Sequence, residues 1–244
     1  MKQTSRLEEG NMHSHREWRY SITVALLLIT GLFLGSTASG VSAQEAADSE
    51  GKSARETLRE TTDKVLVVID AARDYVDDDP ERYYSAVHEV LDPIVDFRGF
   101  ARGVMGEYAT GDRYRGLDEA GRDQLKDQLE RFTETMRLGL VRTYSKGLLA
   151  FGGSRVELDD SEDADDSANR ATLRQLIFSD AAQPYVVVYL MAKNKSGDWM
   201  MRNLVVENVN LGQIYRSQFE SAARRYDGDL DQVIASWTVE SATD

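Results

Sequence analysis

The sequence predicts an α+β fold in which helices pack on one side of a four- to five-stranded, mainly antiparallel sheet. Two observations support this class. Apolar residues recur with a helical period as far as Gly153, and the period then changes to the alternation of strands. Helical spacing returns from Asn210 onward, so the order along the chain is helices, strands and helices again.

Four helical segments are expected before the strands, at residues 55–76, 80–91, 95–108 and 118–148. The last is the strongest, because its apolar residues follow spacings of four, three and four opposite a charged face. The third is interrupted by Gly99, Gly103 and Gly106. Each glycine costs about 1 kcal/mol against alanine in a helix interior, so close packing or a bend is expected there.

Strands are expected at residues 155–158, 172–178, 185–192 and 199–206. The segment 185–192 is apolar on both faces, which predicts a central strand covered on both sides. The acidic run 159–166 is typical of a solvated turn, and Asn194 to Gly197 predicts a hairpin. Asn210 and Asp229 are expected to begin two final helices.

The N-terminus predicts export from the cytoplasm. Residues 22–34 form a long apolar run without charge, which ends in the A-x-A-like site Val41-Ser42-Ala43 and follows the basic residues Lys2, Arg6, Arg16 and Arg19. This pattern is typical of a secretory signal peptide cleaved near Ala43. An uncleaved anchor is the alternative, since residues 21–38 approach the roughly 20 residues of a membrane span.

The expected organisation is a signal peptide at 1–43, a disordered linker at 44–54, one domain at 55–238 and a disordered tail at 239–244. The chain holds 29 basic and 42 acidic side chains. Residues 1–43 contain four of the basic and three of the acidic side chains, so the exported part has a net charge of −14. Such a charge repels nucleic acid, so no nucleic-acid partner is expected.

Few residues suit catalysis or metal binding. The chain has no cysteine, and His88 is the single histidine outside the predicted signal peptide, which argues against thiol chemistry and histidine-rich metal sites. Residues 159–166, and the aspartates at 227, 229 and 231, lack the glycine that a calcium loop requires. No phosphate-binding or hydrolase motif occurs, so neither an enzyme, a cofactor nor a metal is expected.

A surplus of apolar residues remains, and it either fills an ordinary core or lines a cavity for an apolar ligand. On the second interpretation the fold encloses an apolar cavity. Its candidate residues are chosen by helix face and strand position, and they are Phe100, Val104, Tyr108, Phe132, Met136, Leu140, Tyr144, Val188, Leu190, Trp199, Leu204 and Val206.

Residues 92–111, DPIVDFRGFARGVMGEYATG, resemble the MlaC family, also called the toluene-tolerance auxiliary proteins. That family has a proline, an Asp-Phe pair and a Leu-Gly-x-Tyr-like turn in this order, and the turn here is Met105 to Tyr108. The family's long helix carries residues that match Gln124, Phe132 and Tyr144. The C-terminal half is similar in its Gly-x-Trp turn and its Tyr-Arg-x-x-Phe helix, here Tyr215, Arg216 and Phe219. The resemblance covers about residues 53–238.

This chain departs from the family at one corner. Asn203 stands where an aspartate is common, and Asn208-Val209-Asn210 replaces Gly-Val-Ser. Asparagine also tolerates the left-handed backbone region, so only a modest change of the turn is expected.

The resemblance implies a periplasmic phospholipid carrier without cofactor. Such a carrier shuttles lipid between an outer-membrane lipoprotein–porin complex and an inner-membrane ABC transporter with an MCE-domain protein, and it maintains outer-membrane lipid asymmetry. It buries the acyl chains between sheet and helices and leaves the headgroup near solvent.

Two other functions remain open from the residues. One is an exported enzyme or small-ligand binder on an α+β fold of the nuclear-transport-factor type, with His88 and Asp96 as its candidate acid–base groups. The other is an interaction protein with a solid core. A local basic group, Arg98, Arg102, Arg113 and Arg115, is either a docking surface for an acidic partner or scattered surface arginine.

Overall fold

The computed structural model describes residues 51–150, 155–159, 168–178 and 183–239. The predicted signal peptide, residues 44–50 of the linker, the acidic run from residue 160 and residues 240–244 lie outside them. Helices comprise α1 (Ala54–Ala72), α2 (Pro80–Leu91), α3 (Phe97–Met105), the 3₁₀ turn η2 (Gly106–Ala109), α4 (Gly111–Gly116), α5 (Glu119–Ala150), α6 (Leu211–Arg225) and α7 (Leu230–Ala235). None of the helices in the described residues has the length and apolar content to span a membrane.

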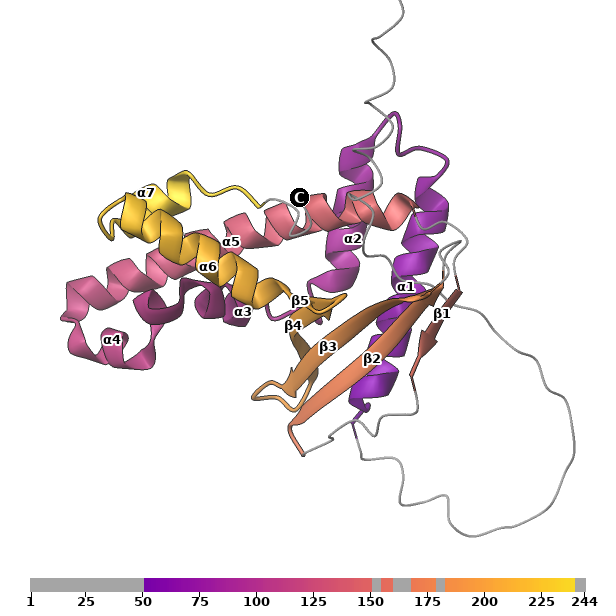
Figure 1. Ribbon diagram of the computed structural model, residues 1–244, viewed down its shortest axis with the longest axis horizontal. Helices are drawn as coiled ribbons and strands as arrows, with labels where there is room; N and C mark the ends of the chain where they lie inside the picture. The colour runs from indigo at the N-terminus through magenta and orange to yellow at the C-terminus, as the bar shows by residue number, and fades with distance from the viewer. Residues whose placement is uncertain (1–50, 151–154, 160–167, 179–182, 240–244) are drawn as a thin grey trace, which may run out of the picture.

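Five strands form one antiparallel sheet in the order β1-β2-β3-β4-β5 (Figure 1). They are β1 (Arg155–Leu158), β2 (Arg170–Phe178), β3 (Tyr185–Lys193), β4 (Trp199–Val206) and β5 (Val209–Asn210). The β3–β4 hairpin turns at Gly197, whose φ of 93° suits glycine. The sheet and its flanking helices confirm the predicted α+β class.

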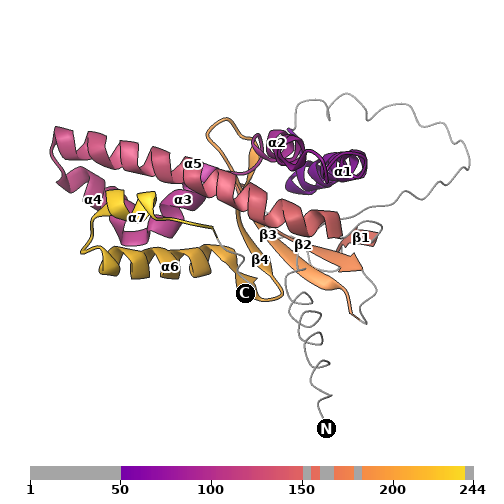
Figure 2. The ribbon, with the colours of Figure 1, turned by 90° about the horizontal axis from the view of Figure 1, so that it is seen from above.

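Helices cover one face of the sheet. Helices α1 and α2 and the C-terminal half of α5 lie over it (Figure 2), and their apolar residues form one core with the sheet. On β3, Val187, Tyr189 and Met191 are buried in this core, whereas Val188 and Leu190 on the opposite face are only half-buried. The prediction that β3 is central is confirmed, but no described helix covers its second face.

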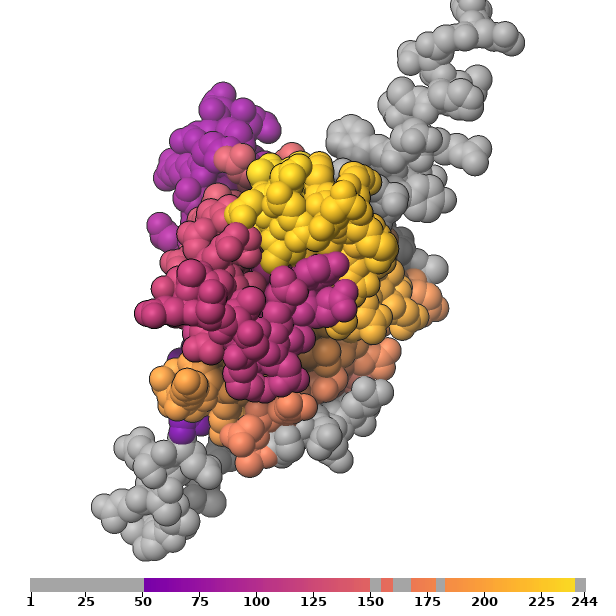
Figure 3. Space-filling model, turned by 90° about the vertical axis from the view of Figure 1, so that its left-hand side faces the viewer, coloured from indigo at the N-terminus to yellow at the C-terminus, as the bar shows by residue number. Residues whose placement is uncertain are grey.

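A second core lies beyond the edge of the sheet. Helices α3, α6 and α7 pack there around the N-terminal half of α5 (Figure 3). Phe132 of α5 and Phe219 of α6 are fully buried at its centre, with ring centroids 4.9 Å apart. Because α5 is 32 residues long, one rigid helix joins both cores.

Side chains cap the predicted helix starts. Asp79, Asn210 and Asp229 each accept a hydrogen bond from the backbone N–H three residues later, which confirms where α2, α6 and α7 begin. Helix α4 and strand β5 were not predicted. Their lengths, six and two residues, are too short to show a hydrophobic period.

Candidate functional site

A cavity of about 150 Å³, partly open to solvent, lies between the helices and the covered face of the sheet. Every layer of the first core contributes to its wall. Helix α1 gives the wall on one side, α5 runs along it, and β3 and β4 form the floor; the lining is Leu58, Thr61, Thr62, Val65, Val87, Leu91, Val95, Phe97, Phe100, Leu140, Val141, Tyr144, Ser145, Leu148, Tyr189, Met201, Arg202, Asn203, Leu204 and Leu211.

Arg202 is the one charged side chain among the described residues of this wall. It lies at a β-bulge, where β4 pairs Met201 with Met191 and Asn203 with Leu190. Arg202 is therefore the extra residue of β4, with no residue of β3 opposite it. Because of this extra residue, Met201 before the bulge and Leu204 after it both face the cavity.

Asp96 fixes the position of Arg202. Its carboxylate accepts a 2.9 Å hydrogen bond from the Gly99 N–H at the start of α3, and it forms an ion pair with the Arg202 guanidinium. Its own N–H donates to the carbonyl oxygen of Met201 at 2.9 Å. The chain between α2 and α3 is thereby attached to β4 at the cavity wall.

A buried hydrogen-bond chain crosses the sheet side of the cavity. The Tyr189 hydroxyl donates to Oε1 of Gln175 at 2.8 Å, and the Gln175 amide donates to the Thr62 hydroxyl at 3.4 Å. All three residues are buried, and burial raises the pKa of Tyr189 well above its ordinary value. These hydrogen bonds satisfy the Gln175 amide and the Tyr189 hydroxyl. Buried polar groups without such partners would destabilise the apolar wall.

Four of the twelve predicted cavity residues line the cavity, namely Phe100, Leu140, Tyr144 and Leu204. Trp199 and Val206 are buried in the first core but do not line the cavity. Val188 and Leu190 lie on the opposite face of β3 from the cavity-lining Tyr189, because successive side chains of a strand alternate between faces.

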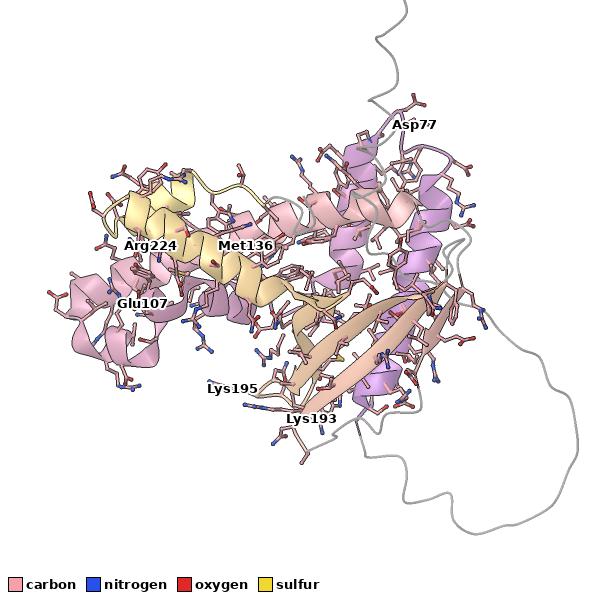
Figure 4. The ribbon with its side chains drawn as sticks, in the orientation of Figure 1. Asp77, Glu107, Met136, Lys193, Lys195 and Arg224 are labelled. Carbon is pink, nitrogen blue, oxygen red and sulfur yellow. The ribbon has the colours of Figure 1, made fainter. Side chains whose placement is uncertain are left out.

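The remaining four belong to the second core, and they are Val104, Tyr108, Phe132 and Met136. Met136 lies on α5 in the part of that helix that belongs to the second core, away from the sheet (Figure 4). These residues share an apolar helix face with Phe100 or with Leu140, so periodicity alone does not separate them from the cavity wall.

Helices α1 and α2 contribute six of the sixteen lining residues that the sequence did not mark. Leu58, Val65 and Val87 line the cavity from these helices. Their helical spacing was visible, but the same spacing is typical of any buried helix. A helix face that lines a cavity and a helix face that packs in a core carry the same types of residue at the same spacing. One sequence therefore holds no signal that distinguishes them.

The other candidate groups lie outside the cavity wall. Nε2 of His88 lies 3.7 Å from Oδ1 of Asp92, beyond hydrogen-bond distance, and His88 does not line the cavity. Asp229 caps α7, and Asp231 accepts hydrogen bonds from Gln128 and Arg131 of α5, which lowers its pKa. The described residues contain no cluster of acidic or histidine side chains that would hold a metal ion.

The corner from Asn203 to Asn210, where this chain departs from the family pattern, forms a tight turn. Asn208 adopts a φ of 68°, the left-handed conformation expected for an asparagine in place of glycine. The Asn203 amide donates to Oδ1 of Asn210 at 2.8 Å, and Asn210 in turn caps α6. Two asparagines therefore join β4 to the start of α6 beside the cavity.

The chain matches known proteins along most of its length. The family model described as MlaC protein matches residues 59–239. The toluene tolerance protein ttg2D of Pseudomonas putida is 27% identical over 187 residues, which cover 77% of this chain and 80% of that protein. A phospholipid-binding protein from Ralstonia solanacearum, solved in complex with a phospholipid, has a similar fold, with a TM-score of 0.62 at 18% identity over 75% of this chain and 94% of that one. The chain belongs to the MlaC family.

Proposed function

We propose that this protein carries phospholipid, with the acyl chains held in the cavity between α1, α5 and the sheet. The observation that supports this most is the composition of the wall. Its lining is apolar or small and neutral except for Arg202 and Asn203. A wall of this kind binds hydrocarbon by excluding water and needs few directional contacts. The protein of similar fold from Ralstonia solanacearum, which was solved in complex with a phospholipid, supports the same function.

Energetics explains why a carrier must enclose the chains. Two acyl chains hold roughly 30 methylene groups, and exposing them to water costs about 25 kcal/mol at about 0.8 kcal/mol each. The cavity of about 150 Å³ matches the size of apolar cavities that stay dry and take one benzene. We therefore infer that the helices and sheet move apart when whole acyl chains enter.

The same wall argues against the alternative of an enzyme. A general acid or base must reach the bound substrate, and no carboxylate or histidine lines the cavity in the described part of the chain. Asp96, the candidate nearest to it, is occupied by the N–H of Gly99 and by Arg202. Transfer without covalent chemistry is the function that these residues support best.

We further propose the periplasm as the site of action, reached through cleavage near Ala43. There the protein would exchange lipid with an outer-membrane lipoprotein–porin complex and with an inner-membrane MCE-domain ABC transporter, and so maintain lipid asymmetry. Membership of the MlaC family and the resemblance to the toluene tolerance protein support this proposal.

Mass spectrometry of organic extracts from the purified protein tests the function directly. The carrier proposal predicts diacyl phospholipid at about one molecule per protein chain. A small polar ligand in the extract would favour the enzyme or small-ligand binder. If the extract is free of lipid, and delipidated protein takes up none from phospholipid vesicles, the carrier proposal is wrong.

A further inference from the structure

Arg202 joins the cavity to the glycine-rich side of α3. Arg202 lines the cavity, and Nη1 of its guanidinium would lie 3.0 Å from a Cβ placed on Gly99. Only a residue without a side chain lets Arg202 approach the helix backbone this closely. The guanidinium therefore lies against the start of α3, and the same residue also lines the cavity.

A second arginine, Arg216, approaches the opposite end of α3. Gly106 follows α3 with a φ of 55°, and a Cβ there would lie 2.9 Å from Nε of Arg216. Between the two contacts, a Cβ on Gly103 would meet no atom within 4 Å. The segment from Gly99 to Gly106 thus has a guanidinium at each end and open space at its middle.

The charged side chains that α3 itself carries are positive, in a strongly acidic protein. Arg98 and Arg102 are the only charged residues of α3, and both are exposed. Neither forms an ion pair with any described residue, whereas Arg216 pairs with Glu220 at 2.9 Å. Arg102 lies three residues after Gly99, so it shares the side of α3 on which Arg202 lies.

We propose that Arg202 and Arg102 bind the phosphate group of the carried phospholipid. A guanidinium has five N–H donors in a fork that fits two phosphate oxygens, and Asp96 engages the Nη1 side of Arg202. Asp96 orients the guanidinium and leaves its other donors for a ligand. The acyl chains would then extend from the phosphate into the apolar cavity. This inference rests on the proposed function, because it places the headgroup of the same ligand.

The test compares two ligands that differ only in the phosphate headgroup. Delipidated wild-type protein and the R202Q and R102Q variants are titrated with phosphatidylglycerol and with diacylglycerol of the same acyl chains. We expect R202Q to weaken phosphatidylglycerol binding about 10-fold to 100-fold, as for loss of a hydrogen bond to a charged group, and R102Q to weaken it less. Both variants should bind diacylglycerol as the wild type does.

Arg224→Gln is the matched control, because Arg224 is exposed near the end of α6 (Figure 4), donates to the Ser221 hydroxyl at 3.0 Å and does not line the cavity. This variant makes the same change in net charge and should bind both ligands normally. If R202Q and R102Q weaken both ligands equally, or neither of them, the phosphate site is wrong. If wild-type protein binds neither ligand, the carrier function itself fails instead.

Inorganic phosphate distinguishes a lipid headgroup from a free ion. Phosphate is titrated into delipidated protein and followed by ³¹P NMR. We expect it to bind at most weakly and to compete with phosphatidylglycerol but not with diacylglycerol. Tight phosphate binding that leaves phosphatidylglycerol uptake unchanged would overturn the assignment to a lipid headgroup. Should R202Q fail to fold, R102Q gives the same comparison.

Discussion

The carboxylate of Asp96 caps α3 and also pairs with Arg202, the one charge in the described cavity wall. These two roles connect the start of a helix with the bulge of a strand that lies more than 100 residues later in the chain. The position of the guanidinium thus depends on the position of α3. A movement of α3 would shift Arg202 and the cavity wall together.

Substitutions of Asp96 separate its two roles. Asparagine caps helices as well as aspartate does but cannot form the ion pair, so Asp96→Asn should lower the free energy of unfolding by about 1 kcal/mol or less. Asp96→Ala removes both the helix cap and the ion pair. Its free energy of unfolding should be about 1–2 kcal/mol lower than that of Asp96→Asn, because the Gly99 N–H loses its acceptor. Urea unfolding at neutral pH measures both. Equal losses in the two variants would show that the cap contributes nothing.

Two glycines of α3 should respond in opposite directions to alanine. A Cβ at Gly99 would overlap the Asp96 carboxylate, whereas one at Gly103 would meet open space. We expect Gly99→Ala to destabilise the protein by about 1–3 kcal/mol and Gly103→Ala to stabilise it by about 0.5–1 kcal/mol. Thermal unfolding of the two variants checks the pair. A stabilised Gly99→Ala variant would mean that Asp96 is not held against α3.

The buried tyrosines predict a loss of stability at high pH. Burial raises the pKa of Tyr83, Tyr189 and Tyr215 above their ordinary value, so above about pH 10 the unfolded chain releases protons that the folded protein keeps. The free energy of unfolding should then fall by about 1.4 kcal/mol per pH unit for each such tyrosine. Urea unfolding between about pH 9 and pH 11 measures the slope.

Tyr189→Phe isolates one of these tyrosines. The slope above about pH 10 should become shallower by about 1.4 kcal/mol per pH unit. At neutral pH the variant should be about 1–3 kcal/mol less stable, because Gln175 is buried and loses the donor to its Oε1 atom. An unchanged slope would indicate that water reaches the Tyr189 hydroxyl in the folded protein.

Much of the fold could be predicted because its elements have clear periods. The spacing in 118–148 predicts α5, and the alternation from residue 155 predicts four strands within two residues of their ends. Helix starts were predicted at Asp79, Asn210 and Asp229, because these residues cap helices through local contacts alone. Local chemistry determines these features, so one sequence is sufficient.

The cavity wall could be predicted only in part because it depends on contacts between distant segments. The strand face that meets the helices is set by packing, which placed Tyr189 rather than Val188 toward the cavity. The bulge at Arg202 shifts the alternation within β4, and no turn residue marks it. The division of α5 between the cavity and the second core depends on where α6 and α7 pack against it.

Native mass spectrometry of cavity-blocking variants tests the central claim most directly. Leu140 lines the cavity, and two residues earlier on α5 Leu138 is 52% exposed, so Leu140→Trp fills the space and Leu138→Trp makes the same chemical change outside it. We predict that wild-type protein and the Leu138→Trp variant carry one phospholipid, while the Leu140→Trp variant is folded but carries little or none. Undiminished phospholipid on a folded Leu140→Trp variant would contradict the claim that this cavity holds the acyl chains.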